Sequence, residues 1–239
     1  MVAGLWHISF YEVIKLCESN SGEFEVSESV APAPTRGALR IGDEAPNFIG
    51  RSTEGMVELA DYRGRWLVFF SHPGDFTPVC TSEFTGFASA IDDFDALDCS
   101  LLGHSVDSLF SHLAWIRALH DELGVTVTFP IIEDPTLEIA RAYGMVSAEA
   151  PNAATVRAVY VIDPDGIVRA ITWYPLSVGR SVAEILRMVA ALRATHGNDA
   201  IAPEGWQPGE SLLANPSFTR SDVLAGKSAT SWFFQPKAD

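Results

Sequence analysis

Apolar positions along the chain follow two alternating spacings from about residue 39 to about residue 198. The run 66–70 is apolar throughout and lies between Arg-Gly-Arg and His-Pro, which is typical of a strand buried on both faces. Further strand-like segments span 99–106, 129–132, 156–162 and 167–173. The sequence Asp-Pro-Asp-Gly joins the last two of these segments and predicts a hairpin turn.

Amphipathic helices are predicted between these strands. Over 82–97 the apolar residues recur at spacings of three, four and seven. Ser108 and Ser181 each precede a further periodic segment and are suited to cap a helix, while a short helix over 136–143 ends at Gly144. Strands that alternate with helices and finish in a hairpin indicate an α/β fold, with a central mixed sheet covered by helices on both faces.

The two ends of the chain differ from this middle part. Residues 1–38 include a polar stretch interrupted by prolines and are expected to form a flexible tail. Residues 199–239 combine prolines with Trp206 and Trp232, which predicts an irregular arm that packs on its own domain or on a partner subunit. The expected organisation is a tail at 1–38, a domain at 39–198 and a C-terminal arm at 199–239 that forms a dimer contact.

Composition and charge narrow the classes of function. In a chain of 239 residues, 16 basic and 31 acidic side chains leave a net charge of −15, which opposes binding to nucleic acid and to anionic membranes. No apolar run approaches the length of about 18 residues that a membrane helix needs. The first residues also lack the basic start of a secretory signal. We therefore expect a cytoplasmic protein with neither nucleic-acid nor membrane partners.

Cys80 is the candidate reactive group. Three cysteines are too few for a disulfide framework, and the odd count leaves at least one thiol unpaired or paired between chains. Cys80 follows the strand 66–70 and lies in the first turn of the next helix, where open α/β sheets bind ligands and where a helix N-terminus stabilises a thiolate. Thr77 lies one turn earlier, within reach of the sulfur. The alternative is that Cys80 is a buried packing residue.

Other cysteine chemistries have less support. Cys80 has no partner at Cys-x-x-Cys spacing, which argues against disulfide exchange within that motif. The three cysteines and six histidines show no paired metal-ligand spacing, so neither a metal nor a cofactor is predicted. Cys99 is expected to be a small core residue. Cys17 lies in the predicted tail, where a resolving role stays open as an alternative.

The loop around Cys80 resembles the active-site motif of the peroxiredoxins, in particular their one-cysteine branch. The pattern Pro-x-x-x-Thr-x-x-Cys is present at Pro73, Thr77 and Cys80. The longer form His-Pro-x-Asp-Phe-Thr-Pro-Val-Cys-Thr-x-Glu runs from His72 to Glu83. Similar segments extend the resemblance from about 39 to 216.

The resemblance implies a thioredoxin-like fold with a C-terminal extension, and an enzyme that reduces hydrogen peroxide and alkyl hydroperoxides. It implies that Cys80 is the peroxidatic thiol and that the Thr77 hydroxyl orients the peroxide. Arg157 would stabilise the thiolate and the peroxide, and Pro73 would shield the pocket. The remaining matches are implied to support the pocket: His72, Glu83 and Arg180.

Two departures from the family pattern matter. Two-cysteine members carry a resolving cysteine in the C-terminal region, whereas no cysteine follows Cys99 here. The sulfenic acid of Cys80 would then need an external thiol, such as thioredoxin or glutathione. The stretch before 66–70 also lacks the serine of the lipase-type element found in some one-cysteine members, so no lipase activity is expected.

The segment 167–173 is expected to be an edge strand, and family members pair through such edges as homodimers or form rings. Two other functions remain as alternatives. One is a non-enzymatic assembly with the C-terminal arm as its contact surface. The other is a hydrolase that uses Cys80 with His72, although no Asn or Asp that would orient His72 is evident.

Overall fold

The computed structural model describes residues 39–146, 152–217, 219–226 and 230–237. The predicted tail at 1–38 lies outside these residues. The fold is built on a seven-stranded sheet in the order β2-β1-β5-β4-β3-β6-β7. Its strands are β1 (Ile49–Ser52), β2 (Gly55–Glu58), β3 (Trp66–Ser71), β4 (Cys99–Ser105), β5 (Ile131–Glu133), β6 (Arg157–Ile162) and β7 (Val168–Tyr174).

The sheet is mixed, as the alternation of elements predicts. Strand β3 pairs in parallel with β4 and antiparallel with β6, and β4 pairs in parallel with β5. The β1–β2, β1–β5 and β6–β7 pairs are antiparallel. Strand β7 lies at one end of the sheet, so the edge position expected for 167–173 is confirmed.

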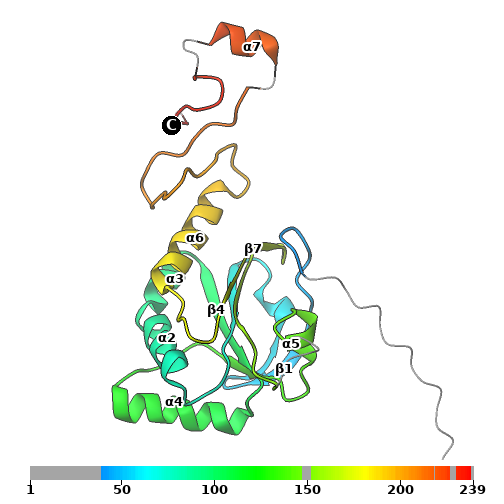
Figure 1. The fold of residues 1–239 in the computed structure, drawn as a ribbon, viewed down its shortest axis with the longest axis vertical. Coiled ribbons are helices and arrows are strands. Elements are labelled where there is room, and N and C mark those ends of the chain that lie inside the picture. The colour runs from blue at the N-terminus through cyan, green and yellow to red at the C-terminus, as the bar shows by residue number, and fades with distance from the viewer. Residues whose placement is uncertain (1–38, 147–151, 218, 227–229, 238–239) are drawn as a thin grey trace, which may run out of the picture. The chain divides into compact units, whose positions relative to one another are not determined.

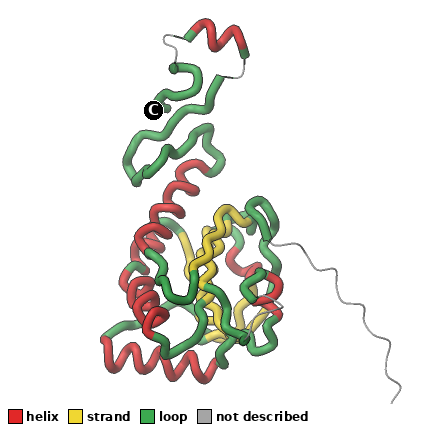
Figure 2. Tube along the Cα trace, in the orientation of Figure 1, coloured by secondary structure: helices red, strands yellow, loops and turns green. Residues whose placement is uncertain are grey.

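Helices cover both faces of the sheet (Figures 1 and 2). Helices α2, α3, α4 and α6 lie on one side of it and α5 lies on the other. Their bounds, with those of the 3-10 turn η1 and the helix of the C-terminal arm, are η1 (Leu59–Tyr62), α2 (Pro78–Ser89), α3 (Ile91–Ala96), α4 (Leu109–Leu123), α5 (Glu138–Ala142), α6 (Val182–Thr195) and α7 (Arg220–Ala225). The expected caps are present, because the Ser108 and Ser181 hydroxyls accept hydrogen bonds from Ser111 N and Glu184 N.

Strand β3 supplies the core on both faces. Val68 and Phe70 face the cluster under α2, α4 and α6, whereas Leu67 and Phe69 face the cluster beside α5. Successive side chains of a strand point to opposite faces, so a strand covered on both sides needs an unbroken apolar run. All six residues of β3 are accordingly buried.

The helix predicted over 82–97 is two helices. Helix α2 begins earlier, at Pro78, and the chain turns at Ala90, whose N–H bonds to Phe87 O instead of continuing the α-helical pattern. Helix α3 then follows. Phe87 and Phe94 still face one core cluster across this break, which is why the apolar spacing does not reveal it.

The sequence analysis missed the hairpin of β1 and β2. Each strand has only four residues, mixes apolar with polar side chains and is largely exposed or half-buried. Neither strand has the apolar run or the clear alternation that identifies the others. Tertiary pairing holds them, because Ser52 of β1 pairs with Ile132 of β5.

The hairpin between β6 and β7 is confirmed. Gly166 lies in its turn with a φ of 76°. This left-handed backbone conformation favours glycine, which has no Cβ.

The C-terminal arm contacts α6 through a buried tryptophan. The carbonyl of Trp206 accepts a hydrogen bond from Arg187 Nη1 at 3.2 Å, and the indole N–H donates to Glu210 O at 2.9 Å. Strand-like bridges join Ile201 to Leu213 and Leu213 to Pro236. At Trp206, therefore, the arm packs on its own domain.

We predict that Phe87→Ala lowers the free energy of unfolding by about 3–5 kcal/mol, because a fully buried ring stacked on Phe70 leaves a cavity. Phe110→Ala is the matched control, since that ring is 74% exposed and its loss should change stability by less than about 0.5 kcal/mol. Urea unfolding at one fixed protein concentration measures both. Equal effects of the two substitutions would contradict the assigned core.

Candidate active site

Cys80 lies beyond the C-terminal end of β3. It is the third residue of α2, in the first turn of that helix. Thr77 is the N-cap residue and Pro78 occupies the first helical position, which suits a residue without an N–H. The first N–H groups of a helix have no acceptor within it and carry partial positive charge. The fully buried Cys80 sulfur is thus held at the positive end of α2.

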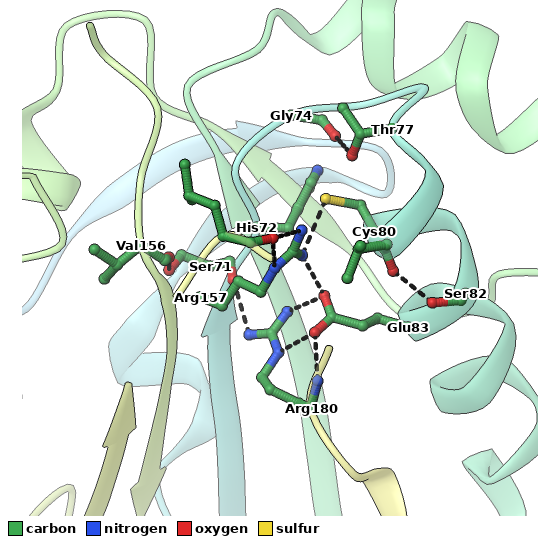
Figure 3. Close-up of polar contacts among 12 residues, drawn as sticks. Ser71, His72, Gly74, Thr77, Cys80, Ser82, Glu83, Val156, Arg157 and Arg180 are labelled. Carbon is green, nitrogen blue, oxygen red and sulfur yellow. Dashed lines mark hydrogen bonds and ion pairs between the residues drawn. The ribbon is translucent and has the colours of Figure 1, made fainter. Parts of the chain in front are cut away.

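Arg157 lies against this sulfur. It is the first residue of β6, and its Nη1 is 3.3 Å from Cys80 Sγ. Nε and Nη2 of the same guanidinium donate to the Leu176 carbonyl at 3.1 and 3.0 Å. Figure 3 shows the guanidinium and the sulfur facing each other across the site. With 3% exposure, the Arg157 side chain has little freedom to leave this position.

Glu83 connects two arginines one turn after Cys80. Its carboxylate accepts from Arg157 Nη1 at 2.8 Å and from Arg180 Nε and Nη2 at 2.9 and 2.7 Å. Burial opposes ionisation of this carboxyl, but the hydrogen bonds and charges of Arg180 and Arg157 outweigh that effect and hold the pKa of Glu83 below its usual range. Glu83 therefore stays ionised in the interior.

The charges of this cluster do not cancel. Two buried guanidinium groups, Arg157 and Arg180, face one carboxylate. The other hydrogen bonds of Arg180, from Nη1, go to the uncharged Ser71 and Ala158 carbonyls at 2.8 and 2.9 Å. One positive charge is left beside the Cys80 sulfur. An anionic sulfur, or an anion bound there, would balance it.

Thr77 and Pro73 lie on the loop that precedes α2. The Thr77 hydroxyl donates to the Gly74 carbonyl at 2.9 Å, which leaves its oxygen lone pairs free to accept. In Figure 3 the Gly74–Thr77 pair lies above the Cys80 sulfur. Pro73 is half-buried in the same loop.

His72 belongs to a separate polar group. Its Nε2 lies 2.9 Å from Asp75 Oδ1, and Asp75 Oδ2 lies 2.9 Å from His112 Nδ1. The imidazole hydrogen bonds outweigh the effect of burial and hold the pKa of Asp75 below its usual range, whereas burial holds the pKa of His72 below its usual range despite Asp75. The pair is thus a carboxylate and a neutral imidazole.

Asp75 and His112 are functional candidates that the sequence analysis missed. Asp75 lies inside the quoted motif without an assigned role, and the absence of a carboxylate to orient His72 was a wrong expectation. His112 is 37 positions away in the chain, so no local spacing connects it to Asp75. The motif residue Asp75 was the available signal.

Among the residues that the structure describes, two groups have a spacing that would suit a cation: His72 with Asp75 and His112, and Asp163 with Asp165 and His196. In the first, the imidazole nitrogens already contact the carboxylate oxygens. In the second, Asp163 accepts from backbone N–H groups and from Arg169. The carboxylates of Asp75 and Asp163 therefore have partners without a metal.

Cys99 is a core residue, as expected. It is 2% exposed in β4, and burial raises the pKa of its thiol to about 12. Such a thiol is a poor nucleophile at neutral pH. Cys17 lies outside the described residues.

Comparison with known proteins identifies the class of this fold and site. Residues 41–171 match the AhpC/TSA family. A peroxiredoxin of Methanosarcina mazei is 39% identical over 213 residues, which are 83% of this chain and 97% of that protein. The chain belongs to the AhpC/TSA family; it is a peroxiredoxin, an enzyme of the thiol peroxidase class with a thioredoxin-like α/β fold.

Solved structures of two mechanistic types are similar. A yeast mitochondrial 1-Cys peroxiredoxin has a TM-score of 0.74 and 36% identity, covering 83% of this chain and all 100% of its own. The reduced 2-Cys peroxiredoxin of Plasmodium vivax has a TM-score of 0.67 and 31% identity, covering 72% of this chain and 92% of its own. Across the described residues, no helix is long and apolar enough to cross a membrane.

Stability should fall on mild acidification. His72 and His104 are fully buried and their pKa values are lowered by burial, so the unfolded chain binds protons first, at pH values below about 6.5. Their stabilising contribution is complete above that pH and is lost as pH falls toward the folded-state pKa. We predict a loss of up to about 1.4 kcal/mol per pH unit for each histidine.

Urea unfolding between about pH 7.5 and about pH 5 tests this prediction, because the carboxylates stay largely ionised in that range. His104→Gln should flatten the slope, since it removes one of the two groups. An unfolding free energy that stays constant or rises on acidification would contradict it.

Proposed function

We propose that this peroxiredoxin works by a one-cysteine mechanism, in which Cys80 reduces hydrogen peroxide and alkyl hydroperoxides. The observation that carries the proposal is the 3.3 Å contact between Arg157 Nη1 and Cys80 Sγ. It places a fixed cation beside a buried nucleophile, in a cluster with one uncompensated positive charge. That arrangement favours a thiolate and the negative charge that develops when a peroxide bond breaks.

The chemical step follows from these positions. The Cys80 thiolate attacks the terminal peroxide oxygen, so that an S–O bond forms while the O–O bond breaks. Alkoxide or hydroxide leaves, takes up a proton and departs as alcohol or water, and Cys80 is left as sulfenic acid. Arg157 stabilises the charge on the departing oxygen. The free lone pairs of the Thr77 hydroxyl accept the hydrogen of the peroxide and orient it.

Recycling then needs a thiol from outside the chain. Cys99 is buried with a raised pKa, and no cysteine follows it. An external thiol attacks the sulfenic sulfur and releases water, and a second thiol resolves the mixed disulfide and frees Cys80. The yeast relative is resolved via glutathione/thioredoxin systems, so glutathione and thioredoxin are the reductants we propose here. Cys17 is the internal alternative.

The other predicted residues complete the proposed pocket. Glu83 and Arg180 hold Arg157 in place, Pro73 shields the sulfur, and His72 supports the start of the loop. A cytoplasmic location would supply reduced thiols. It stays a prediction, as do the flexible tail at 1–38 and the dimer contact of the arm at 199–239. Membership of a thiol peroxidase family decides against the hydrolase and the non-enzymatic assembly as the primary function.

We predict that the reduced protein, without any added thiol, consumes about one equivalent of peroxide per chain. Mass spectrometry should locate the added oxygen on Cys80, and Cys80→Ser should consume none. Arg157→Lys should slow the reaction about 100-fold, because a lysine ammonium cannot reproduce the planar set of contacts to sulfur, carboxylate and carbonyl.

Arg117→Lys is the matched control, since the Arg117 side chain is 77% exposed and pairs only within α4. Its rate should equal that of the unaltered protein. Unchanged peroxide consumption in Cys80→Ser would refute the proposed nucleophile. A Cys17–Cys80 disulfide that forms in place of the sulfenic acid, without added thiol, would contradict the one-cysteine mechanism and identify Cys17 as the resolving thiol.

The oligomeric state is a further prediction. Strand β7 is an open edge that carries Trp173 at 52% exposure, and the arm presents the half-exposed Phe233. Both features favour pairing with a second copy of the chain. Size-exclusion chromatography should therefore show at least a dimer of the 25.9 kDa chain. Trp173→Asp should shift it toward the monomer, and a monomer of the unaltered protein at micromolar concentration would contradict the prediction.

A further inference from the structure

A second buried polar cluster lies behind the loop that carries the active-site threonine. The side chains of His72, Asp75 and His112 are 0%, 1% and 0% exposed. Asp75 accepts from both imidazoles, from His72 Nε2 at 2.9 Å and from His112 Nδ1 at 2.9 Å. Neither the Cys80 sulfur nor the Arg157 guanidinium takes part in these contacts.

Asp75 joins the loop to two other parts of the chain. Through His112 it is held to α4, and through its own backbone N–H it is held to Asp107 Oδ2, at 2.9 Å, in the turn before α4. Asp107 is fixed in turn by the Ser105 hydroxyl, which donates to the same Oδ2 at 2.8 Å. A carboxylate and a backbone N–H of one residue thus bind the loop to the neighbouring strand-helix connection.

The start of the loop is also anchored. His72 N donates to His104 O and His72 O accepts from the Thr155 hydroxyl, each at 2.9 Å. Between His72 and Cys80, Asp75 is the only buried residue, and the other residues of the loop are half-buried or exposed. No other side chain in this stretch can therefore fix the loop from the interior.

The residue after Asp75 adopts a conformation that needs support. Phe76 has a φ of 55° although it is not glycine. It is 60% exposed and its ring contacts Trp115 at 6.5 Å between centroids, so its own packing gives this conformation little support. The residue before Asp75, Gly74, provides the carbonyl to which Thr77 donates. Asp75 lies between the left-handed turn and this carbonyl, and its position determines where both are.

We propose that Asp75 is a positioning residue of the peroxidase reaction: held by His72, His112 and Asp107, it fixes the turn that aims the Thr77 hydroxyl over the Cys80 sulfur. This role rests on the proposed peroxidase function. Asp75 touches neither sulfur nor peroxide, and acts through the backbone of Gly74 and Phe76. A misplacement of about 1 Å in an oriented reactant costs about 100-fold in rate.

The test compares two reactions of the same thiol. Asp75→Ala should slow the second-order reaction with hydrogen peroxide about 100-fold, because the Thr77 hydroxyl is no longer held. Alkylation of Cys80 by iodoacetamide needs no oriented peroxide and depends on Arg157, so its rate should stay the same or rise. General loss of structure would not separate the two rates in this way.

Asp134→Ala is the matched control. Asp134 also pairs with a buried histidine, His104, at 3.2 Å, and it accepts from the Ala140 N–H at 2.7 Å, but it has no contact with the loop. Its removal should destabilise the protein while leaving the ratio of the two rates unchanged. A similar change of that ratio in both variants would overturn the proposal.

Asp75→Asn provides the conservative rescue. Within the described part of the chain, His72 Nδ1 and His112 Nε2 have no hydrogen-bond partner, so either imidazole can carry its proton on the other nitrogen. One amide can then accept from one ring and donate to the other, and the peroxide rate should recover to within about threefold. Failure of this recovery in a folded Asp75→Asn protein would contradict a role based on these hydrogen bonds.

His112→Leu keeps the proposal testable if Asp75→Ala does not fold. It removes the imidazole on α4 that contacts Asp75 from outside the loop. The rate of reaction with peroxide should fall, whereas the rate of Cys80 alkylation should not. If the unaltered protein does not react with peroxide, the proposed function itself fails. If it does react and His112→Leu changes neither rate, only the positioning role fails.

Discussion

The buried carboxylate of Glu83 is the constraint on which the active site depends. It lies between two buried arginines, and removal of one partner from such a group leaves charges without compensation in the interior. The group also connects α2, the start of β6 and Arg180, which lies two residues before α6. Glu83 and the Leu176 carbonyl hold the Arg157 guanidinium from two sides. The guanidinium is therefore fixed in an orientation in which Nη1 faces the Cys80 sulfur.

Two sets of contacts meet at the loop between β3 and α2, and each set has a different effect on the active site. On one side the arginines and the start of α2 hold positive charge around the sulfur. On the other side Asp75 holds the backbone that carries Thr77. The first set governs the charge of the nucleophile. The second governs the position of the Thr77 hydroxyl, and it uses two imidazoles and a carboxylate whose side chains are almost fully buried.

Most of the fold follows from patterns in the sequence. The apolar run of β3, the capped helices and the Asp-Gly hairpin identify the buried sheet, because burial on two faces demands such patterns. The β1–β2 hairpin and the break at Ala90 do not follow. Four-residue strands leave too little periodicity to recognise, and two short helices that share one core cluster keep the spacing of a single helix.

By itself, the sequence determined the position of Cys80 at the start of a helix after a buried strand, the motif around it and the absence of any cysteine after Cys99. Only the tertiary structure decided how the charged groups near the sulfur contact one another. Arg157 and Arg180 lie 74 and 97 positions from Glu83, and His112 lies 37 positions from Asp75. No local pattern connects residues so far apart, because their contacts arise only when α2, β6, α4 and the segment before α6 pack together.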